Sequence, residues 1–392
     1  MVNIAPWRAR GSPAGPPRTI DSPDRKFRVN SVTRPALFGL TVSLLISCSG
    51  GADAPAPWQP EDAFGHLART PVTEADYAGL EVTVLAGETL SDDERIGAVG
   101  GMVVDGDVLW LLSEITDPWL YLVDRRDGNY LGTAGRQGEG PGEFGLLSSI
   151  SSDGTGGIWG NDLSTNRLTH LRSESPAEPV RIVSLPADFT STFRAVRVGN
   201  RFIGWAMRPE DNIRVIGDSG EAIATTTLVP GPDSIGAIPR VFQAANNRLC
   251  SALDGSRAVI AYFDIGRADI VDRDGKFLAQ VEVPFPRPGA FTRSAEGGHD
   301  PERAVMHYQG CATSRDHIYL LHSGARFTWP SSAGEAVVND HARTIHVFDW
   351  TGKPAGIYRL DRVVTAIAVD PEGRELYAAD FETGGVVRFR LP

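Results

Sequence analysis

Short strand-forming segments recur along this chain at a nearly regular interval, and this recurrence restricts the fold more than any other feature of the sequence. Short apolar runs alternate with turn residues on both sides of the segment Gly135-Arg-Gln-Gly-Glu-Gly-Pro-Gly-Glu-Phe144. The 43 glycines and 27 prolines suit many tight turns, and no long stretch carries apolar residues at the spacing of a helix face. Repeated units of short strands indicate a radial, all-β architecture.

The chain divides into six such units, which cover residues 98–134, 146–186, 192–229, 244–284, 306–361 and 363–392. The turn between the two outer strands returns in several units as an Asp followed closely by a Gly, at Asp124 and Gly128, Asp218 and Gly220, Asp272 and Gly275, and Asp349 and Gly352. Glycine accommodates the positive φ that tight hairpin turns need. A spacing of about 46 residues for each unit is typical of a propeller blade.

The last unit has only three strands, at residues 365–369, 375–379 and 386–391. Segment 80–85, Leu-Glu-Val-Thr-Val-Leu, alternates apolar and polar residues just before the first unit, as a half-buried strand does. We predict that it pairs with residues 386–391, which leaves no strand edge open. The predicted fold is therefore all-β: a single six-bladed β-propeller over residues 79–392, closed by pairing of an N-terminal strand with the last blade.

A basic segment containing Arg25, Lys26, Arg28 and Arg34 precedes a short apolar run that ends at Cys48. This run is too short for a comfortable membrane span, and the pattern predicts a secretory signal over residues 1–47. Residues 48–78 begin with small residues, glycines and prolines, which predict a flexible tether.

The sequence Leu45-Ile-Ser-Cys48 resembles the lipobox of bacterial lipoproteins. The resemblance implies that Cys48 becomes the first mature residue and is acylated on its sulfur, and two or more acyl chains anchor a protein stably. Ser49 after the cysteine, as the resemblance implies, favours the outer membrane. We therefore expect an exported protein that is lipid-anchored in the cell envelope. The alternative is a buried free cysteine that follows an apolar strand.

Charge is distributed unevenly along the chain. Residues 1–47 hold seven basic and two acidic residues, and since the whole chain carries −11, the remainder carries −16. Phosphate contacts need clustered Lys and Arg, so the acidic body argues against nucleic-acid binding. The expected partners are the membrane, through the lipid, and a protein or small-molecule ligand.

The units resemble NHL repeats and the six-bladed propeller lipoproteins of bacteria over about residues 80–392. Residues 135–144 match the Gly-x-x-Gly-x-Gly-Pro-Gly-x-Phe segment that joins NHL blades, and Asp162-Leu-Ser-Thr-Asn-Arg-Leu168 and Asp380-Phe-Glu-Thr-Gly-Gly-Val386 are similar to the family's step from Asp through a turn into a strand. The third and fourth units lack the Gly-Pro-Gly element. The resemblance implies the fold and leaves the activity open, because propellers host hydrolases, lyases and binding surfaces alike.

The second strand of every unit ends on one rim of the predicted ring, since every innermost strand runs the same way. Glu114, Asp162, Asp264, His322 and Asp380 lie at these ends. The carboxylates could hold a divalent cation over the channel mouth, as the resemblance to sugar lactonases of this fold implies. Each Asp could instead accept N–H bonds within its own turn. We favour the turn role and expect no cofactor.

Six of the eight histidines lie between His299 and His346, around two insertions at residues 284–306 and 324–342 that reach the same rim. Long loops on a rigid scaffold commonly carry binding residues. The metal-binding spacings His-x-His and His-x-x-x-His do not occur, so we predict a recognition surface and no transition-metal site. Its candidate residues, together with the rim carboxylates, are His299, His307, His322, Arg326, Trp329 and His341.

Cys250 and Cys311 occupy comparable positions in the innermost strands of the fourth and fifth units. A disulfide is permitted outside the cytoplasm, but it needs Cα atoms within about 7 Å, and innermost strands splay apart. A disulfide and two buried thiols are both open. Trp110, Trp159 and Trp205, in second strands of successive units, are predicted to pack between blades.

No catalytic motif stands out, so no catalytic residue is assigned. We expect a membrane-anchored, extracytoplasmic module that binds a ligand or protein without catalysis. The alternative is a metal-dependent lactonase or other hydrolase, or an NHL-type lyase, that uses the channel-mouth rim.

Overall fold

Six β-sheet blades surround a central channel in this computed structural model, which describes residues 79–114, 117–152, 154, 156–189, 191–206, 212–226, 247–263, 266–282, 306–324 and 342–392. The chain forms two compact units, residues 1–53 and 54–392, and every described residue belongs to the second unit. The predicted signal segment and tether, including Cys48, lie outside the described residues. Within these residues, no helix is long and apolar enough to cross a membrane.

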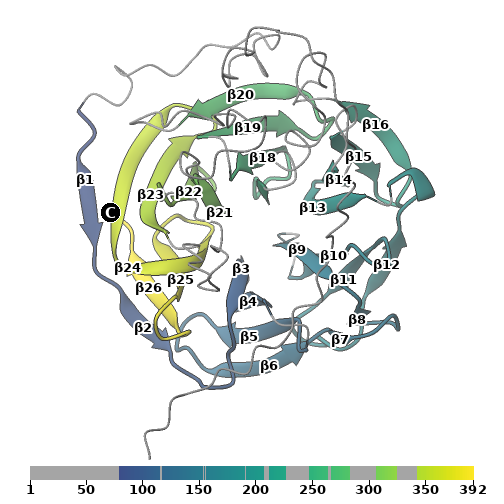
Figure 1. Cartoon of the computed structure of the whole chain (residues 1–392), viewed down its shortest axis with the longest axis horizontal. Helices are drawn as coiled ribbons and strands as arrows, with labels where there is room; N and C mark the ends of the chain where they lie inside the picture. The colour runs from purple at the N-terminus through teal and green to yellow at the C-terminus, as the bar shows by residue number, and fades with distance from the viewer. Residues whose placement is uncertain are drawn as a thin grey trace, which may run out of the picture. The chain divides into compact units, whose positions relative to one another are not determined.

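The first four blades are antiparallel sheets of four strands each (Figure 1). Blade one contains β3 (Val99–Asp105), β4 (Val108–Ser113), β5 (Leu120–Asp124) and β6 (Tyr130–Ala134), and blade two contains β9 (Leu147–Ser152), β10 (Ile158–Asp162), β11 (Arg167–Leu171) and β12 (Arg181–Ser184). Blade three contains β13 (Thr192–Val198), β14 (Arg201–Ala206), β15 (Ile213–Gly217) and β16 (Ala222–Thr226), after the short 3-10 helix η1 (Ala187–Phe189). Blade four contains β17 (Asn247–Ser251), β18 (Arg257–Tyr262), β19 (Arg267–Asp272) and β20 (Phe277–Glu282).

Blades five and six share one long strand, β24 (Pro354–Val369), and so form a single sheet. The first part of β24 is an outer strand of blade five, where it pairs with β23 (Ala342–Asp349), beyond β22 (His317–His322) and β21 (Tyr308–Thr313). Its last part is the innermost strand of blade six, where it pairs with β25 (Glu375–Asp380), which is followed by β26 (Val386–Arg390). The predicted boundary near residue 362 is therefore a continuous strand, because no connecting loop separates the two blades.

The ring closes through a different strand from the predicted one. Segment 80–85 does not pair with residues 386–391: β1 (Val82–Leu85) runs parallel to β24 and adds a strand to blade five. The next strand, β2 (Glu88–Ser91), pairs antiparallel with β26 and completes blade six (Figure 1). The alternating pattern of β1 correctly indicated a strand, but the predicted apolar face is the exposed one: Val82 and Val84 are exposed, and Leu85, on the opposite face, is buried.

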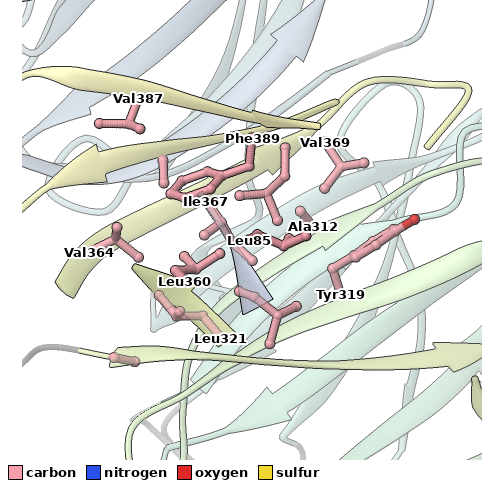
Figure 2. Packing of buried hydrophobic residues seen from close by; sticks show 14 of the residues in the cluster. Leu85, Ala312, Tyr319, Leu321, Leu360, Val364, Ile367, Val369, Val387 and Phe389 are labelled. Atoms are coloured by element: carbon pink, nitrogen blue, oxygen red, sulfur yellow. The ribbon is translucent and has the colours of Figure 1, made fainter. Parts of the chain in front are cut away.

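Burial explains the place of β1. Leu85 is 7% exposed and belongs to the apolar cluster between blades five and six, whereas Val82 and Val84 are 50% and 68% exposed. Figure 2 shows Leu85 among Leu321, Leu360 and Phe389 in this cluster. In contrast, β2 contributes mainly polar contacts, such as the 2.7 Å hydrogen bond from Arg388 Nε to Glu88 Oε1. Hydrophobic periodicity therefore does not reveal β2.

The core lies between blades, and each apolar cluster draws its residues from two successive blades. Strands such as β4, β10 and β15 are buried on both faces, because a neighbouring blade covers each face. Trp110, Trp159 and Trp205 are buried in the clusters between blades one and two, two and three, and three and four, as predicted. The innermost strands pack against one another in cyclic order from β3 through β9, β13, β17, β21 and β24 back to β3.

The recurrent Asp-to-Gly turn of the outer hairpin packs against the preceding blade. Gly128 has φ 77°, and a Cβ at this position would lie 1.7 Å from the carbonyl oxygen of Leu90 in β2. Gly220 has φ 93°, and its Cβ would lie 2.4 Å from the carbonyl oxygen of Ser184 in β12. Both the left-handed backbone and the close approach require glycine, so the repeat in the sequence reflects a repeated contact between blades.

The Gly-Pro-Gly segment connects blade one to blade two. Its two short strands, β7 (Arg136–Gln137) and β8 (Glu143–Phe144), pair in parallel. Phe144 is fully buried, and its carbonyl accepts a 2.9 Å hydrogen bond from Trp119 Nε1. The segment therefore has a structural role between the blades.

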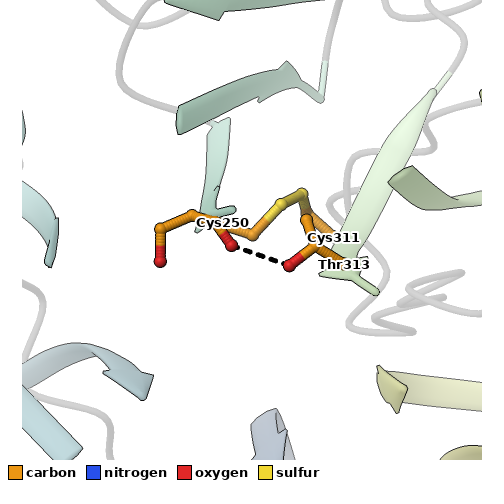
Figure 3. The surroundings of a disulfide bond; sticks show 4 residues. Cys250, Cys311 and Thr313 are labelled. Carbon is orange, nitrogen blue, oxygen red and sulfur yellow. Dashed lines mark hydrogen bonds between the residues drawn. A yellow bond between two sulfur atoms is a disulfide. The ribbon is translucent and has the colours of Figure 1, made fainter. Parts of the chain in front are cut away.

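Hydroxyl side chains link neighbouring innermost strands where the pleated edges face each other. Ser149 Oγ donates to the Ala195 carbonyl at 3.2 Å, Thr313 Oγ1 to the Ser251 carbonyl at 2.7 Å, and Thr365 Oγ1 to the Val99 carbonyl at 2.7 Å. Between β17 and β21 a covalent link is added: Cys250 and Cys311 form a disulfide with their Cα atoms 5.8 Å apart (Figure 3). Of the two alternatives left open by the sequence, the structure has the disulfide, because β17 and β21 are close enough at these positions to be bridged.

The assignment of β2 as the closing strand leads to a truncation test. A chain that starts at residue 87 keeps β2 and loses only β1, so we expect cooperative unfolding with a loss of about 2–4 kcal/mol for the buried Leu85. A chain that starts at residue 92 loses both strands and exposes the edge of β26, so we expect aggregation or no cooperative transition. Urea unfolding followed by tryptophan fluorescence, with a chain from residue 79 as the control, measures both effects. Loss of cooperative folding in the chain from residue 87 would contradict this closure.

Candidate functional site

The two ends of the channel differ in what they carry. We call the loop rim the end at which the second strand of each blade finishes and successive blades connect. The turn rim is the opposite end, where tight turns join the first and second strands of each blade. Of the predicted site residues, Glu114, Asp162, His307, His322 and Asp380 lie at the loop rim, whereas Asp264, His299, Arg326, Trp329 and His341 lie outside the described residues.

Asp162, at the end of β10, is fully buried and serves its own turn. Its carboxylate accepts 3.0 Å hydrogen bonds from the backbone N–H groups of Gly145 and Leu146, and further bonds from Ser164 and Thr165. Burial alone would raise the pKa of Asp162, but the hydrogen bonds from its neighbours outweigh it and lower this pKa below the ordinary value. The carboxylate joins blade two to the connection that precedes it.

Asp380, at the end of β25, has the same arrangement. Its Oδ1 accepts backbone hydrogen bonds from Glu382 at 2.8 Å and Thr383 at 3.1 Å, and Arg362 Nη1 lies 3.3 Å from its Oδ2.

Glu114 is exposed beside Gly100 at the start of β3. Among the described residues, no three His, Cys, Asp or Glu side chains are arranged to hold a metal ion.

A cluster of imidazoles lies beside the core between blades four and five. His307 Nδ1 is 3.3 Å from His322 Nε2, and the ring of His322 stacks on that of His346 with centroids 4.7 Å apart. Tyr308 Oη lies 3.3 Å from His346 Nδ1. The structure thus brings together two predicted site residues, His307 and His322, and adds His346. Sequence reasoning did not assign His346, although its place in β23, directly opposite Leu320 of β22, puts it on the same sheet face as His322.

Burial keeps this cluster neutral at ordinary pH. It lowers the pKa of His307 to about 3, with a further contribution from His322, and it lowers the pKa of His322 to about 4. The pKa of His346 is also lowered far below its usual value, first by burial and then by the two neighbouring histidines. A second proton in this cluster would place like charges together in a desolvated space.

The channel is a cavity of about 420 Å³, and the innermost strands of all six blades line it. Its arginines come from blades three and four: Arg194 and Arg197 from β13, and Arg248 from β17. The guanidinium of Arg197 reaches Asp218, 2.6 Å away. Arg194 and Arg248 lie near the starts of their strands and therefore at the loop-rim end. Sequence reasoning missed both residues, although arginines within innermost strands were a usable signal.

At the turn rim, backbone atoms from successive blades approach closely. Gly199 and Gly255 lie in the turns that follow β13 and β17, and a Cβ at Gly255 would lie 2.5 Å from the backbone nitrogen of Gly199. Both glycines line the channel together with Asp254, whose carboxylate accepts hydrogen bonds from the Ser256 backbone at 2.9 Å and hydroxyl at 2.6 Å. The lining therefore carries a carboxylate at the turn rim and arginines toward the loop rim.

The neutral histidine cluster gives a pH prediction. In the unfolded chain these imidazoles take up protons below their ordinary pKa of about 6.5, whereas in the folded state the lowered pKa values keep them unprotonated. Stability is therefore full above about pH 6.5 and falls as the pH drops. We expect a loss of roughly 2 kcal/mol for each of the three histidines, up to about 6 kcal/mol in all, between pH 7 and pH 5, a window in which carboxylates contribute little.

Urea midpoints at several pH values measure this loss. A His346→Leu variant should show a shallower pH dependence than the wild type, because one of the titrating groups is gone. His317→Leu, a change at the other end of β22, serves as the matched control and should keep the wild-type slope. Stability that does not vary from pH 7 to pH 5 would contradict the role of the cluster.

Comparisons with known proteins agree with this architecture. No curated protein matches the chain in sequence. A solved structure of a DUF4221 family member from Bacteroides vulgatus has a TM-score of 0.50 at 10% identity, covering 79% of this chain and 97% of that one. BF0058, an exported-protein candidate from Bacteroides fragilis, has a TM-score of 0.48 at 12% identity, covering 82% of this chain and 97% of that one.

The β-propeller domain of Cps50 (Swd1) from Myceliophteria thermophila has a TM-score of 0.42 at 10% identity, covering 78% of this chain and all of that one. Such low identities speak to the fold alone and carry no function across. The family model described as TolB-like 6-blade propeller-like matches residues 101–372. Since this match spans more than half of the sequence and includes strands from all six blades, the chain belongs to the TolB-like six-bladed propeller-like family.

Proposed function

We propose that this protein is a lipid-anchored module of the cell envelope that binds a small-molecule ligand at the loop-rim end of its channel and does not transform it. The observation that carries the proposal is the channel itself, a cavity of about 420 Å³ with arginines toward the loop rim. Its size lies within the range of ligand pockets in proteins. Asp162 and Asp380, two of the rim carboxylates considered as cation ligands, are bound to their own turns.

Two features support a place outside the cytoplasm. The segment that ends in Leu45-Ile-Ser-Cys48 has the form of a lipoprotein signal. The disulfide between Cys250 and Cys311 is of a kind that persists in oxidising compartments. Within the proposal, the NHL-like segment at residues 135–144 joins blades, and the loop-rim residues His299, Arg326, Trp329 and His341 are candidates for the rest of the binding surface.

The anchor is tested by metabolic labelling with an alkyne analogue of palmitate. The wild type should carry the label and sediment with membranes, whereas Cys48→Ser should lose the label and become soluble, because the acylated sulfur is gone. Ser49→Ala, one residue further on, leaves the sulfur in place and should behave as the wild type. A Cys48→Ser protein that keeps the label would refute the lipidation site.

The binding role is tested by incubating the purified protein with a small-molecule extract of its own cells. After gel filtration, native mass spectrometry should show one molecule retained per chain, and the mass of the released molecule should equal that of a compound already in the extract. A released molecule with a new mass would favour the enzyme alternative. Retention of nothing from the extract would overturn the binding proposal.

A further inference from the structure

Two guanidinium groups from neighbouring blades share the loop-rim end of the channel. Arg194 is in β13 and Arg248 is in β17, and both line the cavity. We propose that this pair holds a small organic anion through a carboxylate or phosphate group. The inference deepens the proposed function, on which it rests, by naming the chemical class of the ligand.

Arg194 is the stronger indication. Its Nη1 donates a 2.8 Å hydrogen bond to the Ser148 carbonyl, and the ring of Phe193 lies 5.7 Å from its guanidinium carbon. Its Nε is buried and has no hydrogen-bond partner among the described residues. The Arg194 side chain is half-buried: it lines the channel, and protein atoms surround the rest of it. This burial and the nearby charge of Arg248 both lower its pKa.

A guanidinium stays protonated in proteins even when its surroundings lower its pKa. A desolvated cation destabilises the fold unless an anion pairs with it. Among the described residues, Arg194 has one neutral carbonyl and, close by, a second cation, and these do not balance its charge. A bound carboxylate or phosphate would supply the missing negative charge at the part of the side chain that remains accessible.

Arginines of blades two and three show how a guanidinium is paired with a carboxylate elsewhere in this protein. Arg181 and Arg197 both contact the carboxylate of Asp218, at 2.7 Å and 2.6 Å, and Arg201 pairs with Asp274. Across the part of the chain that the structure describes, no carboxylate lies within the 4 Å of Arg194 that would define an ion pair. Asp254, a carboxylate of the channel lining, lies in the β17–β18 turn at the turn rim, whereas Arg194 lies toward the loop rim.

The chemistry of the lining is consistent with an oxyanion at this end of the channel. The planar guanidinium donates two parallel hydrogen bonds to a carboxylate or phosphate, which adds strength and orientation. Residues 48–392 carry a net charge of −16, so the arginine pair does not belong to a generally basic body. Ser149 and Gln309 also line the cavity, so its wall is partly polar.

The test uses inorganic phosphate and citrate as two separate probes, titrated into the wild-type protein by calorimetry at constant ionic strength in chloride. At least one probe should bind, and the comparison shows whether a phosphate or a carboxylate is preferred. Arg194→Met removes the charge at nearly constant volume, and it should weaken binding about tenfold or more, since a charge-assisted pair is lost. Arg201→Met, which removes an arginine from the same hairpin outside the channel lining, is the matched control and should bind as the wild type does.

Two results would overturn the anion site: neither probe binds the wild type, or Arg194→Met binds as tightly as the wild type. Should Arg194→Met fail to fold, Arg194→Lys keeps the charge and removes the planar fork, and it should also bind more weakly. The failure of this inference differs from the failure of the binding role. A neutral or cationic molecule retained from the cell extract would leave the binding module in place and reject the anion.

Discussion

The pairing of β2 with β26 is the contact on which the rest of the molecule depends. It joins residues about 300 positions apart in the sequence, through the register Glu88↔Arg388 and Thr89↔Val387. Each apolar cluster lies between two blades, so a blade without its neighbour exposes a whole face of its core. The seam also receives the turn at Gly128, which reaches the carbonyl of Leu90. Closure therefore fixes blade six against blade one and, through them, the shape of the channel.

The rim carboxylates and the channel arginines have different environments in the fold from those that the sequence suggests. In the sequence, the carboxylates at the ends of second strands look available for a cation. In the folded chain, Asp162 and Asp380 replace missing backbone partners in tight turns. The arginines of β13 and β17 look like ordinary strand residues in the sequence, yet Arg194 and Arg248 line the cavity. This placement of charges is the basis for the proposed anion site.

Much of the fold could be predicted from the sequence, because the strand rhythm and the turn glycines are local signals. The strand predicted at residues 375–379 is β25, Glu375–Asp380, and the unit boundaries agree with those of the blades in the first four sheets. The choice between β1 and β2 as the closing strand depends on a partner about 300 residues away, which alternation does not identify. The continuous β24 was missed because a boundary between units was predicted near residue 362, and the sequence has no local signal that a strand continues from one blade into the next.

The site was harder to predict, because its features depend on which side chains from different blades meet. Nearness along the sequence grouped His307 with His322, but His346 joins them through the pairing of β22 with β23. The lack of a partner for Arg194 Nε among the described residues becomes visible only when the neighbouring strands are in place. Five of the predicted rim residues lie outside the described residues, so their part in binding stays a prediction.

The bond between Cys250 and Cys311 has a consequence for the integrity of the protein. It encloses the whole of blade four beyond its first strand, together with the connection to blade five, in a covalent loop with a sequence separation of 61 residues. A protease that cuts once inside this loop leaves both fragments attached to each other. Such a nicked molecule would stay in one piece, with the wall of its channel still held across blades four and five.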